Sequence, residues 1–540
     1  MVHQVNGHSN GQPAGSPAPG LNDSHAAPNA IGQRRNLVMF MPDQLRYDSL
    51  GCTGNPVIKT PHFDQLAREG TLFKNCFTQA SVCTQSRCSM FTGQYLHTSA
   101  HRSLDFLLKP WEDNMFKVLK DAGYHVCTIA PRGDLFSPGV TEMSVTEHGW
   151  IESPPNWPPK YRQRGGVGAG IPPPPNPSIN QRLFFRGVLT EAESEDYDEA
   201  TIQSALTWLK SSPPEPFCLF LPLFYPHPPF QVKDPYFSMY RELELPPRVK
   251  LDDKTGYEPG FMAAIRREHG LERATEEHWH EVKSVYYGMI SRLDDQLGEL
   301  VSILKSAEHG SLWDRTYTMM FTDHGEYLGD SNMIEKWPSG LHEVLTRDPL
   351  IIAGPDLPQG NTNEALCEMV DLTPTVLELL GVQERYPHSG KSLVRTIRDN
   401  LPDHKEYAFS EGGFLVKEGP LLENAGFPYD RKSGLQHEET ELVGRAVSVR
   451  DKDWAYTYRL YEPPELFNRH EDPGEAHNLA DLPEHAATCL KFERAIMRWI
   501  VATSDYVPWE KDPRFPEVAL ESTKSQMEKR AAAMNGKFNH

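Results

Sequence analysis

Four short apolar runs, each followed at once by polar residues, constrain the fold of this chain more than any other feature. They are NLVMFM from Asn36, HVCTIA from His125, FCLFLPLF from Phe217 and TYTMMF from Thr316. Continuous apolar runs of this length are typical of strands that are buried on both faces, and helical patterns separate the four runs. The sequence therefore predicts an α/β fold, with a large mixed or parallel sheet flanked by helices.

Polar clusters stand where the predicted strands end. They are Asp43 with Gln44, residues 131–134 (PRGD), the proline-flanked His227, and Asp323 with His324, which Lys336 and His342 follow. Open α/β sheets bind ligands at the edge where the carboxyl ends of their strands meet. Each residue also has a plain structural explanation, because an Asp after a strand forms turns and a His between prolines can be purely structural.

The stretch FTQASVCTQSRCSMFTG, residues 77–93, combines a thiol with a cation. A helix is predicted from Thr84, with Gly93 as its stop, so that Cys83 lies at the helix N-terminus. The helix dipole favours anions there and lowers a thiol pKa. Arg87 lies on the same face one turn later. This arrangement suits chemistry on sulfate or phosphate, although a lone Cys is as often a small buried hydrophobe.

Composition and patterning predict the domain organisation. Residues 1–34 are rich in Gly, Pro, Asn and Ser and are predicted to be disordered. Residues 35–385 form the predicted catalytic α/β domain, with a Pro/Gly-rich insertion at 151–195 that could cover the site as a lid. Residues 386–510, with the alternating run GRAVSVRDKDWAYTYRLY, form a predicted antiparallel α+β subdomain, and 511–540 form a polar tail.

Net charge and cysteine usage exclude several classes of partner. Lys+Arg 54 against Asp+Glu 74 gives 54 − 74 = −20, which disfavours nucleic acid. The eight cysteines show no disulfide framework or paired metal spacing, the N-terminus lacks a signal-peptide core, and no apolar run could span a membrane. We expect a cytoplasmic protein. The pair Asp294-Asp295 lies inside a helical pattern, which favours capping or a solvated face over a metal site.

Seven strings occur together in the order and spacing of one known family. They are NLVMFMPDQLRYDSLG, CTQSRCSMFTGQYLH, FYPHPPF, YYGMISRLDDQLGEL, FTDHGEYLGD, VDLTPTVLELLG and ELFNRHEDPGEAHNLAD, across roughly residues 36–500. In these strings the chain resembles the type I sulfatases of the alkaline-phosphatase-like superfamily. The resemblance implies an alkaline-phosphatase-like fold and a metal-dependent hydrolase of sulfate esters.

The resemblance also implies a role for each matching residue. Asp43, Asp323 and His324 match ligands of one divalent cation, with Gln44 and Cys83 at the remaining positions of that site. Cys83 matches the nucleophile that the family converts to formylglycine, and Arg87 the group that steadies its hydrate. His227 and Lys336 match groups that bind the ester oxygens. A ligand set made mostly of oxygen points to Ca²⁺, Mn²⁺ or Mg²⁺, and its one imidazole favours Mn²⁺ without excluding Ca²⁺.

Two positions depart from the family pattern. Gln85 stands where the modification signal has proline, which weakens the expectation of formylglycine. Residues 131–134 replace the usual Gly-Lys-x-His string. Arg132 keeps the positive charge there, whereas Asp134 introduces an anion, as in some phosphonate monoester and phosphodiester hydrolases of the superfamily.

Three functions follow as hypotheses. The first is hydrolysis of small-molecule sulfate monoesters, and the second is hydrolysis of phosphonate monoesters or phosphodiesters in the same site. The third is a catalytically silent binding protein, which the complete residue set argues against. The organic part of the substrate cannot be read from the sequence, and a homo-oligomer remains open.

Overall fold

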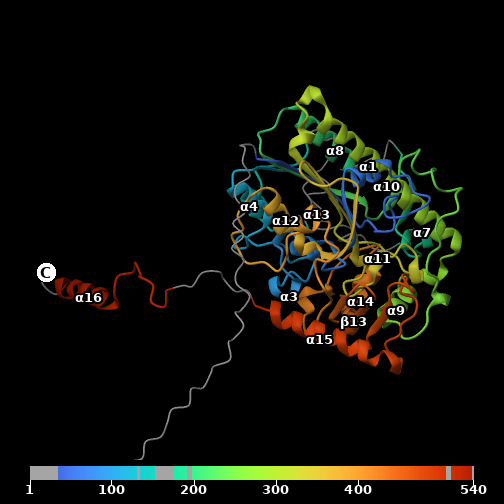
Figure 1. Cartoon of the computed structure of the whole chain (residues 1–540). Coiled ribbons are helices and arrows are strands. Elements are labelled where there is room, and N and C mark those ends of the chain that lie inside the picture. The colour runs from blue at the N-terminus through green and yellow to red at the C-terminus, as the bar shows by residue number, and fades with distance from the viewer. Residues whose placement is uncertain (1–33, 130–133, 152–173, 191–196, 506–512, 538–540) are drawn as a thin grey trace, which may run out of the picture. The chain divides into compact units, whose positions relative to one another are not determined.

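The first apolar run of the chain forms an inner strand of a mixed sheet, between β8 and β6, and Figure 1 shows the helices around that sheet. The computed structural model describes residues 34–129, 134–151, 174–190, 197–505 and 513–537, and the structural statements below concern these residues. The sheet has eight strands in the order β10-β2-β9-β8-β1-β6-β3-β4. Their bounds are β1 Asn36–Asp43, β2 Gly70–Phe77, β3 His125–Thr128, β4 Glu147–His148, β6 Phe217–Pro226, β8 Thr316–Phe321, β9 Arg347–Ala353 and β10 Asn361–Glu368. Neighbours are parallel except where β9 meets β2 and β8.

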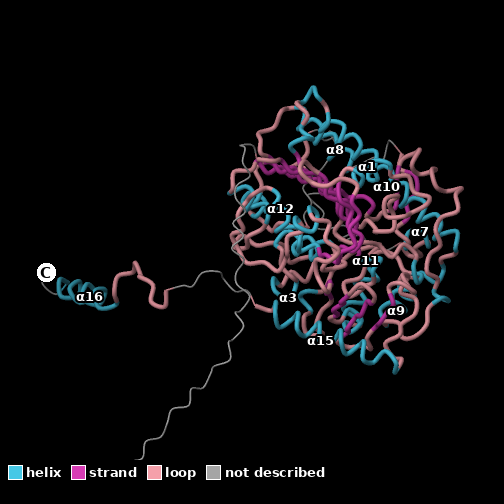
Figure 2. Tube along the Cα trace, viewed as in Figure 1, coloured by secondary structure: helices cyan, strands magenta, loops and turns pink. Residues whose placement is uncertain are grey.

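Alternate residues of β1 enter two separate hydrophobic cores. Val38 and Phe40 join the core under α1 (Pro61–Arg68), α8 (Tyr197–Lys210) and α10 (Glu276–Lys305). Leu37 and Met39 join the core under α2 (Cys83–Thr92), α4 (Met115–Asp121) and α12 (Leu372–Leu379). In Figure 2, α1, α8 and α10 lie on one side of the magenta sheet and α12 lies on the other. A one-residue shift of β1 would exchange its faces, so this double burial fixes the strand register and the position of Asp43 at its end.

A second, smaller sheet lies later in the chain, as predicted. β11 (Ala408–Gly412), β12 (Ala446–Arg450), β13 (Trp454–Arg459) and β14 (Glu465–Asn468) pair in this order, all antiparallel. Helix α15 (Ala486–Thr503) covers one face through Phe492 and Trp499, which pack with Val449, Tyr456 and Leu466. The antiparallel α+β character is therefore confirmed, whereas the domain boundary near residue 386 stays a prediction.

The four strands predicted from apolar runs are all present, but β2 and β10 were not predicted. Within the predicted insertion, residues 174–190 form α7 (Ile179–Arg182) and β5 (Phe185–Val188), which pairs with β7 (Phe230–Val232). The other parts of that insertion, and the tail at 1–33, lie outside the described residues. The remaining helices are α3 Leu96–Ser99, α5 Val140–Ser144, α9 Gly260–Glu268, α11 Glu343–Thr346, α13 Val394–Arg398, α14 Asp430–Glu438 and α16 Thr523–Lys537.

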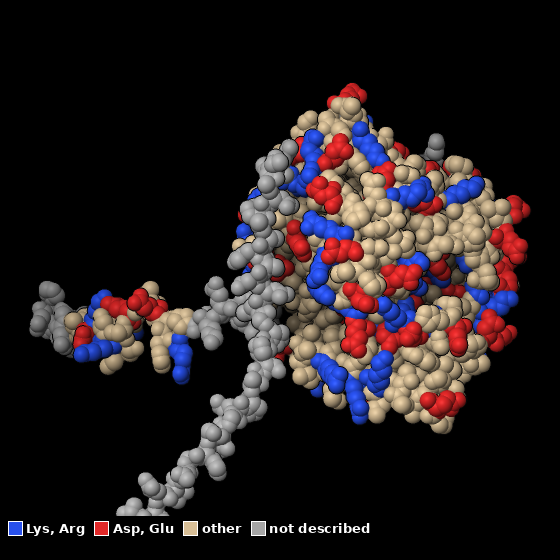
Figure 3. All heavy atoms as spheres, in the orientation of Figure 1, with Lys and Arg blue, Asp and Glu red and all other residues tan. Residues whose placement is uncertain are grey.

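The structure also describes the surface charges, the cysteines and the apolar character of the helices. On the face seen in Figure 3, basic and acidic side chains are interspersed. All eight cysteines lie in the described ranges as free thiols. Among the described helices, none combines the length and apolarity that crossing a membrane requires.

Candidate active site

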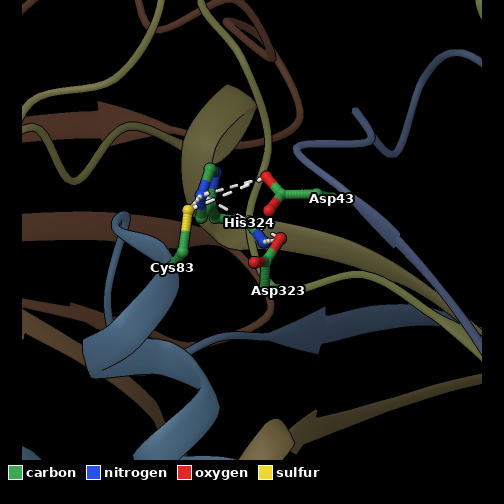
Figure 4. A group of neighbouring side chains, drawn as sticks. All are labelled: Asp43, Cys83, Asp323 and His324. Atoms are coloured by element: carbon green, nitrogen blue, oxygen red, sulfur yellow. Dashed lines mark hydrogen bonds and ion pairs between the residues drawn. The ribbon is translucent and has the colours of Figure 1, made fainter. Parts of the chain in front are cut away.

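Three predicted clusters meet at one edge of the central sheet. β1 ends at Asp43, and its parallel neighbour β8 is followed within three residues by Asp323 and His324. Cys83 is the first residue of α2. One ligand atom from each of the four side chains lies within 4.8 Å of the others. Figure 4 shows these side chains pointing toward one another from three segments that are distant in sequence.

Arg87 lies one helical turn after Cys83 and binds three carboxylates. Its guanidinium lies 2.6 Å from Asp43 Oδ2, 2.8 Å from Asp323 Oδ2 and 2.7 Å from Asp134 Oδ1. The Arg87 side chain is 1% exposed, and those of Asp43 and Asp323 are fully buried. Gly93 ends the helix with φ of 69°, a left-handed conformation that glycine adopts without steric cost, as predicted.

His324 is oriented by its own backbone. Its Nδ1 lies 2.9 Å from the Gly325 carbonyl oxygen, which can only accept a hydrogen bond. Nδ1 therefore carries the proton, and Nε2 presents a lone pair 3.1 Å from Cys83 Sγ and 4.0 Å from Asp43 Oδ1. A backbone carbonyl that fixes the tautomer in this way is a common partner of metal-binding histidines.

The donor set fits a divalent cation. Two fully buried carboxylates and a neutral imidazole nitrogen converge, and Arg87 supplies one positive charge against the two negative charges of Asp43 and Asp323. Buried carboxylates need compensating charge, and a hard or borderline ion such as Ca²⁺, Mg²⁺ or Mn²⁺ would supply it. The roles of these residues as ligands stay a prediction.

The position of Cys83 at the helix N-terminus predicts a lowered thiol pKa, and this prediction is wrong when only the protein's own groups act on the thiol. Burial raises the pKa of the Cys83 thiol well above its usual range, and the Asp43 carboxylate raises it further. Lys336 and Arg87 oppose this shift without reversing it. The position at the helix N-terminus, which suggested an ionised thiol, is outweighed by complete burial beside two carboxylates. At neutral pH, these groups hold the thiol protonated.

Gln44 and Lys336 form a buried pair beside the cluster. Lys336 Nζ donates to Gln44 Oε1 at 2.6 Å, and the Gln44 amide nitrogen donates to Glu326. The Gln44 backbone N–H donates to Asp323 Oδ1 at 3.1 Å, from a left-handed backbone with φ of 66°. The side-chain oxygen of Gln44 therefore already accepts from a cation, and its role as a metal ligand stays a prediction.

Sequence reasoning missed the groups that hold Lys336. Its Nζ lies 2.7 Å from Glu335 Oε1, and Lys432 of α14 lies 2.8 Å from Glu335 Oε2. Lys432 also donates to the Lys336 carbonyl. Burial alone would lower the pKa of Lys336, but nearby Cys83 and Glu335 raise it well above its usual range. Glu335 adjoins a predicted residue and could have been suspected, whereas nothing in the sequence links Lys432 to the site.

The other predicted residues are placed as follows. β6 ends at Pro226, the register partner of Asp43, so His227 follows at the same sheet edge. Its Nδ1 lies 2.6 Å from the Pro228 carbonyl oxygen. Arg132 lies outside the described residues. His342 forms a hydrogen bond through Nδ1 with the Tyr327 hydroxyl at 2.9 Å, and its Nε2 lies 3.3 Å from Glu465 Oε1.

Asp294 has the capping role that its helical position suggested. Its carboxylate accepts from the backbone N–H groups of His62 and Phe63, in the first turn of α1. Asp295 accepts from the Tyr236 hydroxyl at 2.5 Å. The pair thus ties α1 and the segment near Tyr236 to α10.

Comparison with known proteins shows the family of this chain. A family model described as Sulfatase matches residues 35–382. The multifunctional alkaline phosphatase superfamily protein PehA of Trinickia caryophylli is 27% identical over 527 residues, which cover 87% of this chain and 96% of that protein. Arylsulfatase K of Danio rerio is 24% identical over 473 residues, which cover 83% and 80%. The phosphonate monoester hydrolase of Agrobacterium radiobacter has the same fold, with a TM-score of 0.68 at 22% identity over 87% of this chain and 96% of that one. Because the family model spans well over half of its length, the chain belongs to the sulfatase family.

Proposed function

We propose that this protein is a metal-dependent hydrolase of sulfate monoesters, with the nucleophile at position 83. The observation that carries the proposal is the convergence of Asp43, Asp323 and His324 on Cys83, with Arg87 bound to both carboxylates. Membership of the sulfatase family supports it, as does the similarity to a protein named as an arylsulfatase.

Each side chain has a chemical task in this proposal. A divalent cation held by Asp43, Asp323 and His324 would supply a Lewis acid for the ester. Lys336 stays protonated and donates to an ester oxygen where negative charge develops. The Nδ1 proton of His227 is bound to a carbonyl, so only the doubly protonated imidazolium form carries a second proton, on Nε2, that it would give to the leaving oxygen.

Cys83 is proposed to act as formylglycine, although Gln85 departs from the family signal. Without a metal ion, burial holds the thiol protonated, which makes it a poor nucleophile, and a thiolate attached to sulfur would need a separate hydrolysis step to release sulfate. As the hydrated aldehyde, the residue would attack sulfur through one hydroxyl, and the S–O bond to the alcohol would break with the alcohol oxygen taking a proton. Loss of the proton from the second hydroxyl would then re-form the aldehyde C=O and break the C–O bond to sulfate, which leaves. Arg87 lies one turn away to steady the residue.

A second candidate is hydrolysis of phosphonate monoesters or phosphodiesters. Asp134 accepts from Arg87 at 2.7 Å and adds a third carboxylate to the surroundings of that cation. This anion favours substrates with one negative charge over those with two, because like charges repel in a buried site. Sulfate monoesters, phosphonate monoesters and phosphodiesters each carry one negative charge, whereas phosphate monoesters carry nearly two near pH 7.

A substrate panel tests the proposal. Protein from a host that modifies Cys83 would be assayed with 4-nitrophenyl sulfate, 4-nitrophenyl phenylphosphonate, bis(4-nitrophenyl) phosphate and 4-nitrophenyl phosphate, alongside the mass of the Cys83 peptide and metal analysis. We expect sulfate-ester hydrolysis to exceed the other activities, with the phosphate monoester slowest. Cys83→Ala should be inactive, and Cys88→Ala, a buried cysteine on the same helix, serves as the matched control. Modified, metal-loaded protein that cleaves none of the four esters would refute the proposal.

A further inference from the structure

A segment remote in sequence from the predicted site residues is anchored against Lys336. In α14, Lys432 binds Glu335 and the Lys336 carbonyl, and all three side chains are at least nine-tenths buried. Two residues earlier, Asp430 accepts from Arg182 at 2.7 Å. Arg182 ends α7, within the described part of the predicted insertion. The ion pair of Lys432 with Glu335 and that of Asp430 with Arg182 therefore hold the start of α14 between α7 and the loop that carries Lys336.

Tyr429 lies immediately before these anchors. Its ring packs against Phe184, with ring centroids 4.7 Å apart, and Phe184 stacks on His269 at 5.5 Å. The hydroxyl oxygen is buried and has no hydrogen-bond partner among the described residues. A buried hydroxyl without a partner loses free energy on desolvation, so native structures seldom retain one without a reason.

Charged groups of the active site act on the pKa of that hydroxyl. Burial raises the pKa of Tyr429 well above its usual range, and Glu335 raises it further, with Lys336 and Cys83 also acting on it. Tyr429 in turn acts on the pKa of Lys336. The phenol therefore stays neutral near pH 7 and can donate a hydrogen bond. Lys432, three residues later, donates to the Lys336 carbonyl and so brings this segment to Lys336.

We propose that Tyr429 is a further substrate-contacting residue, whose hydroxyl donates a hydrogen bond to the leaving-group oxygen of the ester. This inference rests on the proposed function, because it assumes an ester whose leaving group lies near Lys336. An oxygen acceptor would satisfy the hydroxyl that the protein leaves unpaired. The packing of Phe184 and the two ion pairs fix the ring, so the donor is held in place before substrate binds.

Tyr429→Phe tests the inference, because it removes the hydroxyl and keeps the ring on Phe184. We expect kcat/KM for phenyl sulfate to fall roughly 10-fold or more, since a hydrogen bond to an oxygen that gains negative charge is worth more than one between neutral groups. The loss should be smaller for 4-nitrophenyl sulfate, whose leaving oxygen gains less charge. Tyr456→Phe is the matched control, because the hydroxyl of Tyr456 in β13 donates to Glu493 of α15, and the rates of this variant should not change.

Product binding separates this inference from the proposed function. Binding of 4-nitrophenol to metal-loaded protein needs no turnover, and Tyr429→Phe should weaken it several-fold while leaving the binding of inorganic sulfate unchanged. If the parent protein binds both products but cleaves no ester, the proposed function fails and the role of Tyr429 is still tested. Unchanged 4-nitrophenol binding in Tyr429→Phe, or an equal loss of kcat/KM for both esters, would overturn the inference.

Discussion

Replacing Arg87 by Met should destabilise the metal-free protein severely. The substitution removes the positive charge and keeps a chain of similar length, so Asp43 and Asp323 lose a partner at 2.6 and 2.8 Å in a fully buried site. Breaking a buried ion pair by removing one partner costs about 3–5 kcal/mol, and the second buried carboxylate adds to this. The pair with Asp134 adds less, because that side chain is 19% exposed.

A divalent cation should restore part of this loss. An ion bound by Asp43, Asp323 and His324 compensates the same two carboxylates, and at 100 times its dissociation constant it stabilises a protein by about 2.7 kcal/mol. We therefore expect the urea midpoint of Arg87→Met to rise more with Ca²⁺ or Mn²⁺ than that of the parent protein. The control is Arg385→Met, which breaks an exposed ion pair with Asp121 and should cost about 0–1 kcal/mol with no response to metal.

The assay is urea unfolding of both variants and the parent protein, with EDTA and with added metal. Equal midpoints for metal-free Arg87→Met and metal-free parent protein would refute the charge argument. A urea midpoint of Arg87→Met that is the same with EDTA and with each divalent ion would instead refute the metal site. It would mean that Asp43 and Asp323 bind no cation even when their charges are uncompensated.

Two further predictions concern His227 and Asp294. His227→Ala should slow esters with poor leaving groups more than esters with good ones, because the proposed proton transfer matters most for a basic leaving oxygen; an equal loss across a series of phenyl sulfates would indicate a structural role. Burial raises the pKa of Asp294 to about 7, and the N–H groups of Phe63 and His62 only partly oppose this. Because the folded pKa exceeds the unfolded value, this contribution to stability is full below about pH 4 and is lost as pH rises through 7. The unfolding free energy of Asp294→Asn should therefore vary less between pH 4 and 7 than that of the parent protein, and parallel pH profiles would contradict this.

The sequence was informative where backbone geometry alone brings residues together. Asp43, Asp323 and His324 follow parallel strands, whose carboxyl ends share one edge, so their meeting follows from the strand pattern. Cys83 and Arg87 are one helical turn apart, so their proximity could be predicted from helix geometry alone. The strands that escaped prediction have weaker patterns. β2 contains the half-exposed Lys74 and Asn75, and β10 lies at the sheet edge with a polar first half.

What the sequence could not give depends on packing between distant segments. Lys432 and Tyr429 reach the site because α14 docks on the loop that carries Glu335, a contact about 100 residues apart along the chain. The thiol pKa was mispredicted for the same reason, since helix position is readable from sequence and complete burial beside carboxylates is not. Tertiary context decides both the electrostatics of the nucleophile position and the identity of the groups around it.

The charge balance of the site constrains how an anionic ester can bind at all. Arg87, the cation nearest to Cys83 along the helix, is shared by three carboxylates, and Lys336 is paired with Glu335. Lys432 also binds Glu335, so these described groups carry three positive and four negative charges when ionised, and a sulfate ester would meet a net negative site. Hydrogen bonds from already paired cations cannot offset that repulsion. A divalent cation makes the net charge positive, and we therefore expect the metal to bind before the ester. The affinity of the site for anions should then depend on the ion that Asp43, Asp323 and His324 would hold.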